Sequence, residues 1–253
     1  MAWSDTEQRL LDGPHGRLTE LRDLLHIMRE FMAAFRAMHF IGPCVTVFGS
    51  ARFSDDHPYY QQAREIGARL AQIGFAVVTG GGPGIMEAAN RGAQEAGGLS
   101  VGASIELPFE QKFNRFLDKH VHFDFFFVRK LMLRKYSCGF IALPGGYGTL
   151  DEIFEVLTHI KTGKMKHFPV VLVGKEYWGG MMEFLRKNSL GEKTINQEEL
   201  DSIFLTDSPE EAVQHVLKVS QEQFGVKRAK APKPSKLLFE KRAIPHSQLF
   251  RNL

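Results

Sequence analysis

The chain has 253 residues, of which 43% are hydrophobic and 24% are charged, and its formal net charge is +3. This composition is typical of a soluble globular protein, and the length allows one well-buried core with terminal extensions. So small a positive surplus, spread over the whole chain, does not by itself argue for a nucleic-acid partner.

Signals for export, membrane insertion and metal binding are missing from the sequence. The first 22 residues show no basic region followed by an apolar stretch, and no apolar run approaches the length of a membrane span. The two cysteines, Cys44 and Cys138, have no CxxC or Cys/His ligand spacing, so we interpret them as structural residues. We therefore expect a cytoplasmic protein with no membrane partner and no metal.

Residues 1–42 are predicted to form a helical arm. Apolar side chains recur along it at steps of three and four residues, which places them on one side of a helix. This apolar stripe consists of Leu18, Leu21, Leu24, Leu25, Met28, Phe31, Met32 and Phe35. We favour a helix that packs this stripe on the domain core, and a dimerisation arm is the alternative.

From residue 43 to residue 224, β-rich runs alternate with helical patterns. The expected strands are Cys44–Phe48, Phe75–Thr79, Ser100–Ile105, His120–Phe127, Cys138–Leu143 and Val170–Val173. The expected helices are Pro58–Ile73, Ile85–Ala96, Val128–Tyr136, Leu150–Lys161, Tyr177–Lys187 and Pro209–Val219. Such alternation implies right-handed crossovers. We predict an α/β domain of the Rossmann-like, doubly wound type, with a mostly parallel sheet and helices on both faces.

Residues 225–253 form a basic segment interrupted by prolines. A segment of this composition buries too little apolar surface to order itself, so we expect a solvated tail. Contact with nucleic acid or with a membrane is the less favoured alternative. The few apolar residues of this segment leave open that the tail docks on a neighbour.

A glycine-rich turn, Thr79 to Gly84, follows the second expected strand. Backbone N–H groups that no side chain obstructs, beside the positive end of a helix dipole, suit a phosphate group. The turn matches neither the dinucleotide fingerprint nor the Walker A loop. Ligand binding by this turn and a plain tight turn therefore both remain open at this point.

A second glycine loop, Pro144 to Thr149, leads from the fifth expected strand into a helix whose first turn should hold Asp151 and Glu152. Two carboxylates would repel a phosphate, unless the ligand carries its phosphate at one end and a developing cation at the other. Ribose 5-phosphate is such a group. Arg129 and Lys130 open another helix, where positive charge opposes the helix dipole unless it meets an anion or a carboxylate.

Three motifs together resemble one known family. They are TGGGPGIMEAANRG from Thr79, the Arg129-Lys130 pair, and PGGYGTLDE from Pro144 to Glu152. The chain resembles the Lonely Guy family over roughly residues 43–219 and looks like a longer, bacterial-type member. Members are cytokinin riboside 5′-monophosphate phosphoribohydrolases and related nucleotide nucleosidases, often mislabelled lysine decarboxylases. A pyridoxal enzyme needs a Schiff-base lysine with supporting residues, and nothing in this chain singles one out.

The resemblance implies roles for particular residues. Arg129 and Glu152 match the family's catalytic arginine and glutamate. Substrate binding is expected from the two glycine loops and the helices beside them: Gly81, Gly82, Gly84, Lys130, Gly145, Gly146, Tyr147, Gly148, Thr149, Asp151 and Thr158. Glu110 is a weaker match to a substrate-binding acid, because the spacing of its loop differs by one residue.

The expected reaction is hydrolysis of AMP or N6-modified AMP to a free base and ribose 5-phosphate, through an oxocarbenium-like transition state. Glu152 would stabilise the ribosyl cation or activate water, and Arg129 would orient Glu152 or the ribose. The resemblance implies no cofactor and no metal, and it implies a homodimer or larger homo-oligomer. The alternative is a carrier of the same fold that binds a nucleotide or a molybdenum cofactor without hydrolysing it.

Overall fold

The computed structural model describes residues 6–105, 113–165 and 168–225 of the chain. The strands are β1 Cys44–Phe48, β2 Ala76–Thr79, β3 Ser100–Ile105, β4 Lys119–Phe123, β5 Ser137–Ala142, β6 Val170–Val173 and β7 Ile203–Thr206. The helices are α1 Thr6–Leu11, α2 Arg17–Met38, α3 Pro58–Gln72, α4 Ile85–Glu95, α5 Phe126–Tyr136, α6 Tyr147–Lys161, α7 Lys175–Phe184, α8 Gln197–Asp201 and α9 Pro209–Phe224, with a π-helical segment, η1, at Leu185–Leu190. Nearly all of the predicted basic tail lies outside the described residues.

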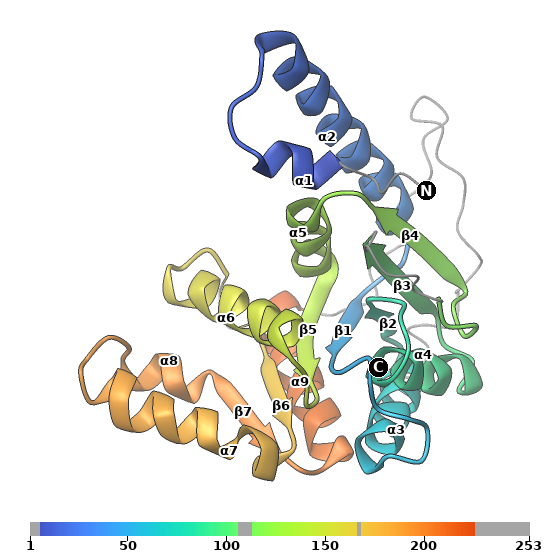
Figure 1. Ribbon diagram of the computed structural model, residues 1–253. Helices are drawn as coiled ribbons and strands as arrows, with labels where there is room; N and C mark the ends of the chain where they lie inside the picture. The colour runs from blue at the N-terminus through green and yellow to red at the C-terminus, as the bar shows by residue number, and fades with distance from the viewer. Residues whose placement is uncertain (1–5, 106–112, 166–167, 226–253) are drawn as a thin grey trace.

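The strands of the described chain form one seven-stranded sheet in the order β4-β3-β2-β1-β5-β6-β7 (Figure 1). Every neighbouring pair is parallel. The predicted α/β class, a doubly wound Rossmann-like fold, is confirmed. The prediction missed β7, a four-residue strand directly after the short helix α8.

Helices cover both faces of the sheet, because the side chains of each strand alternate between two apolar cores. Along β1, Cys44 and Phe48 join one core, whereas Val45 and Val47 join the other. The first core is closed by α2, α5, α6, α7 and α8, and the second by α3, α4 and α9. Strands buried on both faces read as continuous apolar runs, which is the pattern that the sequence shows.

The chain order reverses at the centre of the sheet, between β1 and β5. From β1 the chain builds outward through β2, β3 and β4, and β5 then starts the other half on the opposite side of β1. In open α/β sheets of this kind, ligands bind outside the carboxyl ends of the strands at such a reversal. The loops after β1, β2 and β5 therefore bound the expected binding crevice.

The fourth strand ends earlier than predicted. It stops at Phe123, and α5 begins at Phe126, so the predicted strand over residues 124–127 is wrong. Aromatic residues favour strands by local propensity. Here, however, the N–H groups of residues 124, 125 and 126 donate to carboxylates of the helical arm instead of a neighbouring strand.

The helical arm comprises α1 and α2, which project from the end of the sheet beside β4 and α5 (Figure 1). The buried residues of α2 are Asp23, Ala34 and Met38. In the apolar stripe, Phe31 and Phe35 are partly buried against the core. The other six members are exposed: Leu18, Leu21, Leu24, Leu25, Met28 and Met32.

The prediction that this stripe packs on the domain core is therefore wrong for most of it. Helical periodicity identifies an apolar face but not what covers that face, and α2 packs on the domain with a different side. Among the described helices, α2 included, none is both long enough and apolar enough to cross a membrane.

Candidate active site

Three loops meet at the carboxyl ends of the central strands. The Ser50 N–H, after β1, donates to the Pro144 carbonyl, after β5, at 2.9 Å. The loop after β2 joins them, because the Ile85 N–H donates to the Ser50 carbonyl at 3.0 Å. A side chain at Gly84, which has φ +67°, would collide with the Ser50 backbone, and one at Gly145 would collide with the Thr149 hydroxyl. Glycine is thus required at both positions for the loops to approach.

The loop after β2 is braced from inside the protein. The Gly81 N–H donates to the hydroxyl of Thr79 at 2.9 Å. The amide of Asn114 donates to the Gly82 carbonyl at 3.1 Å, and its backbone N–H donates to the Gly81 carbonyl at 2.9 Å. Buried Asn90 connects this network to β3 through Ser100. The Gly81 N–H is therefore engaged by Thr79, which leaves this loop as a fixed wall of the crevice.

The loop after β5 leads directly into α6, which begins at Tyr147 with Gly146 as its N-cap. No side chain caps this end, and the first turn carries no acidic residue. Asp151 and Glu152 thus lie in the second turn, and their predicted position in the first turn is wrong. The uncapped N-terminus of α6 presents the positive end of its dipole to the crevice, as phosphate binding requires.

Arg129 lies in α5 and reaches across the end of β3. Its Nε donates to the Ala103 carbonyl at 2.7 Å, and its Nη1 lies 4.0 Å from Oε1 of Glu152. Its side chain is 13% exposed. Burial lowers the pKa of Arg129 and the two nearby carboxylates of α6 oppose that shift, but a guanidinium remains charged at neutral pH.

Glu152 faces Arg129 from the second turn of α6, with a side chain that is only 4% exposed. Its second oxygen, Oε2, is buried and has no hydrogen-bond partner among the described residues. Burial raises the pKa of Glu152 to about 7, although Arg129 and Lys130 act to lower it. A carboxyl group with this pKa exchanges a proton near neutral pH, which is what a general base or acid needs.

Lys130 points to α6 rather than to an open anion site. Its Nζ lies 2.8 Å from Asp151 and 2.7 Å from Glu155. Burial disfavours the charge on Lys130, but the carboxylates of Asp151 and Glu155 outweigh it and leave the lysine pKa raised. Arg134 also pairs with Glu155. This network locks α5 against α6 and so fixes the two helices that carry Arg129 and Glu152.

The structure brings most of the predicted residues to one edge of the sheet, but not all of them. Tyr147, at the start of α6, is 92% exposed. Thr158 donates to the Phe154 carbonyl. It lies on another side of α6 from Glu152, because the two residues are six positions apart and so do not share a helix face. It lines a separate cavity of about 120 Å³ that α8 also borders. Glu110 lies outside the described residues.

Two residues that contribute to this site, Gly80 and Glu155, were not predicted from the sequence. A side chain at Gly80 would come within 2.7 Å of Sδ of Met86 and 2.9 Å of Nη2 of Arg129, so glycine at this position leaves room for both side chains. Glu155 joins Lys130 to Arg134 between α5 and α6. Gly80 belongs to the quoted TGGGPG motif, whereas the role of Glu155 depends on a contact between distant segments.

One group of metal-ligating type occurs among the described residues, where α2 meets the entry to α5. The ligand atoms of His26, Glu30 and Asp124 lie within 4.8 Å of one another. Nε2 of His26 is 2.8 Å from Asp124, and Glu30 accepts hydrogen bonds from the N–H groups of Asp124 and Phe125. The three side chains thus bond to protein groups and join α2 to the start of α5.

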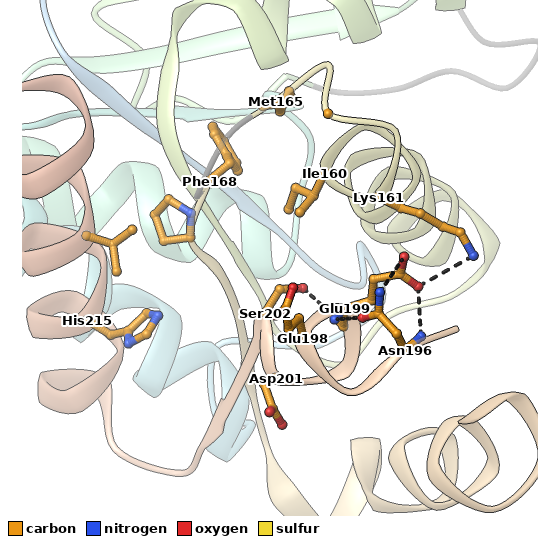
Figure 2. Close-up of a pocket in the computed structure, with 13 residues that line it drawn as sticks. Ile160, Lys161, Met165, Phe168, Asn196, Glu198, Glu199, Asp201, Ser202 and His215 are labelled. Atoms are coloured by element: carbon orange, nitrogen blue, oxygen red, sulfur yellow. Dashed lines mark hydrogen bonds and ion pairs between the residues drawn. The ribbon is translucent and has the colours of Figure 1, made fainter. Parts of the chain in front are cut away.

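A cavity of about 600 Å³ opens at the opposite edge of the sheet, beside the amino end of β6 (Figure 2). Lys161 and Glu199 at its rim lie 3.4 Å apart, and Asn196 and Glu199 cap α8. In this fold class ligands bind at the carboxyl ends of the strands. The larger cavity is therefore not the candidate active site.

Comparison with known proteins finds a matching family model and several related sequences. Residues 86–216 match a family model described as "Possible lysine decarboxylase". A cytokinin riboside 5′-monophosphate phosphoribohydrolase of Rhodococcoides fascians is 33% identical over 146 residues, which cover 56% of this chain and 73% of that protein. One from Mycobacterium tuberculosis is 35% identical over 119 residues, covering 46% and 62%.

Solved structures show the same fold. The molybdenum cofactor binding protein of Rippkaea orientalis aligns with a TM-score of 0.55 and 22% identity, covering 70% of this chain and 97% of that one. At this identity the likeness concerns the fold alone.

The raised pKa of Glu152 predicts that stability depends on this carboxyl. Because its pKa is about 7 in the folded chain and about 4.5 when unfolded, it contributes stability below pH 4.5 that is lost as the pH rises through 7. We expect Glu152→Gln to match the wild type near pH 4.5 and to be more stable at pH 8 by on the order of 3 kcal/mol. Urea unfolding at both pH values measures the difference.

The exposed carboxylate of Glu198 provides the matched control, because Glu198→Gln should show no such pH-dependent gain. A Glu152→Gln variant that is less stable than the wild type at pH 8 would mean that the pairing with Arg129 outweighs the cost of burial.

Proposed function

This chain belongs to the Lonely Guy family, and from that premise we propose that it hydrolyses the N-glycosidic bond of a nucleoside 5′-monophosphate. The proposed substrate is AMP or an N6-modified AMP, and the products are the free base and ribose 5-phosphate. The observation that carries the proposal is Glu152, a buried carboxyl with one unpartnered oxygen and a pKa of about 7, held 4.0 Å from Arg129.

The bond that breaks joins C1′ of the ribose to a nitrogen of the base. The electron pair of this bond leaves with the base, which gains a proton, and positive charge develops on C1′ and the ring oxygen. A water molecule adds its oxygen to C1′ and gives up a proton. Ionised Glu152 is suited to accept that proton and to stabilise the developing cation, because its Oε2 has no competing donor among the described residues.

Arg129 and the glycine loop have complementary tasks in this proposal. Hydrogen bonding to the Ala103 carbonyl orients the guanidinium, which favours the ionised form of Glu152 and contacts the ribose. The uncapped start of α6, at Gly146 to Gly148, offers backbone N–H groups to the 5′-phosphate. A phosphate bound there lies several bonds from C1′, so the substrate separates the anion site from the carboxylate.

The alternative is a carrier that binds a nucleotide or a molybdenum cofactor without cleaving it. It rests on the fold shared with the Rippkaea orientalis cofactor-binding protein. A carrier needs the phosphate-binding loop but has no use for a buried carboxyl with a pKa near 7. The position and burial of Glu152 beside Arg129 therefore favour the hydrolase.

The proposal is tested by incubating the purified protein with AMP, N6-substituted AMP and other nucleoside monophosphates, and by following base and ribose 5-phosphate with chromatography. We expect the wild type to release base and Glu152→Gln to lose activity by about 10²–10⁴-fold, the usual contribution of general acid–base catalysis. The acid limb of kcat/KM should follow an apparent pKa of about 7. Activity depends on the ionised carboxylate, so it should rise as the pH increases.

Glu198→Gln serves as the control, and adenosine tests whether the 5′-phosphate is needed. Full activity of Glu152→Gln would refute the role of this carboxylate. Binding of AMP without base release from any nucleotide would replace the hydrolase with the carrier.

We also propose that the protein is a homodimer or larger, and that α2 pairs with α2 of a second copy. The apolar stripe includes residues 18, 21, 25, 28, 32 and 35, whose alternating steps of three and four are those of a coiled-coil seam. The six exposed residues of the whole stripe leave on the order of 600 Å² of apolar surface open, which approaches the ~800 Å² that each partner buries in a standard interface. They are Leu18, Leu21, Leu24, Leu25, Met28 and Met32. A second copy of the same stripe matches this seam in length and chemistry.

A charge in the middle of the stripe should separate the copies. We expect light scattering to give the mass of a dimer or larger for the wild type and of a monomer for the double variant Leu25→Glu, Met28→Glu. Leu11 is an exposed leucine of α1 outside the stripe, and the control variant Leu11→Glu should keep the wild-type mass. A monomeric wild type, or a double variant with unchanged mass, would refute pairing through α2.

A further inference from the structure

The backbone N–H groups of Asp124, Phe125 and Phe126, at the entry to α5, are capped by the helical arm and not by α5 itself. The Glu30 carboxylate, on α2, accepts the N–H groups of Asp124 at 3.2 Å and Phe125 at 3.3 Å. The Glu7 carboxylate, on α1, accepts the N–H of Phe126 at 3.0 Å and 3.1 Å. Three consecutive amides at the start of one helix are thus satisfied by two carboxylates from segments about a hundred residues earlier.

The local sequence of α5 cannot supply this cap. Its N-cap residue is Phe125, which has no side-chain acceptor, and its first turn contains no acid. The side chain of Asp124 is engaged with His26 at 2.8 Å. Arg129 and Lys130 add positive charge near the helix start, where the dipole is already unfavourable to cations. The two carboxylates of the arm therefore satisfy the amides and also offset this charge.

The capped turn leads directly to Arg129. The N–H of Arg129 donates to the carbonyl of Phe125 at 3.1 Å. The N–H of Phe125 in turn donates to the Glu30 carboxylate, so the backbone of Arg129 is linked to Glu30 through one residue. At the other end of the side chain, the guanidinium is tied to Ala103 and lies 4.0 Å from Glu152. Movement of the first turn of α5 must therefore change how the guanidinium meets Glu152.

Further contacts hold the arm against this turn. Lys119 of β4 donates to the Ala37 carbonyl near the end of α2, and buried Asp23 of α2 pairs with Arg9 of the segment that carries Glu7. Glu30 is half-buried, and burial raises its pKa to about 7 while its two backbone hydrogen bonds act to lower it. A carboxylate kept in such a place needs the amides that it caps.

We propose that Glu7 and Glu30 are positioning residues for Arg129, so that the helical arm forms part of the catalytic unit. Both residues lie outside the segment 86–216 that matches the family model, whereas Arg129 and Glu152 lie within it. The arm thus completes a site whose reacting groups come from the shared domain. This inference rests on the proposed hydrolase function for its effect on turnover, but the cap itself does not depend on that function.

The test compares Glu30→Ala, Glu7→Ala and the double variant in the full-length chain, with AMP as substrate. We expect kcat to fall about tenfold in Glu30→Ala and further in the double variant, with KM changed by less than about threefold, because small misplacements of catalytic groups act mainly on the chemical step. Glu30→Gln, whose amide oxygen can still accept a hydrogen bond, should recover part of kcat. Glu20→Ala, on the same helix but away from α5, is the control.

Hydrogen exchange supplies a readout that needs no activity. In Glu30→Ala and Glu7→Ala, the amides at the start of α5 should exchange at least about tenfold faster, while α4 remains as protected as in the wild type. Faster exchange together with lower kcat supports the proposal. Unchanged exchange refutes the cap, and faster exchange with unchanged kcat refutes the positioning of Arg129. If the wild type itself releases no base, the proposed function fails, and the exchange data still decide whether the arm holds this turn.

Discussion

A carboxylate buried beside one arginine at 4.0 Å, with its other oxygen unpartnered, is the constraint on which the rest of this site depends. Charged groups leave water at a large cost, and a single partner at this distance recovers only part of it. This cost disfavours the ionised form of Glu152 and raises its pKa to about 7. The fold therefore holds a group that destabilises it at neutral pH, which is common where the group serves a reaction.

Several parts of the structure serve to hold this pair in place. Glycines at positions 80, 84 and 145 let three loops and the Arg129 guanidinium approach one another where side chains would collide. The ion pairs of Lys130 and Arg134 with α6 fix the spacing of the two helices. The reversal between β1 and β5 sets the start of α6 at the crevice. Each feature is modest alone, but together they determine where Arg129 meets Glu152.

Local patterns in the sequence predicted most of this arrangement. Apolar runs between glycines identified six of the seven strands, and the two glycine loops identified the crevice, because both signals depend on neighbouring residues. The start of α5 was not predictable in this way, since Phe123 to Phe127 favours a strand and the acceptors that begin the helix lie on Glu7 and Glu30. The exposed face of α2 was missed for a related reason, because periodicity does not reveal which side meets the domain.

Glu152 is buried and incompletely paired, and a pKa of about 7 leaves it protonated in about half of the molecules near neutral pH. Infrared difference spectra of the wild type minus Glu152→Gln, recorded from pH 4 to pH 9, isolate the carboxyl stretch of this residue. We expect a protonated carboxyl band that disappears with a midpoint near pH 7. A midpoint at or below the ordinary glutamate value of about 4.5 would contradict it, because Arg129 would then neutralise the carboxylate fully.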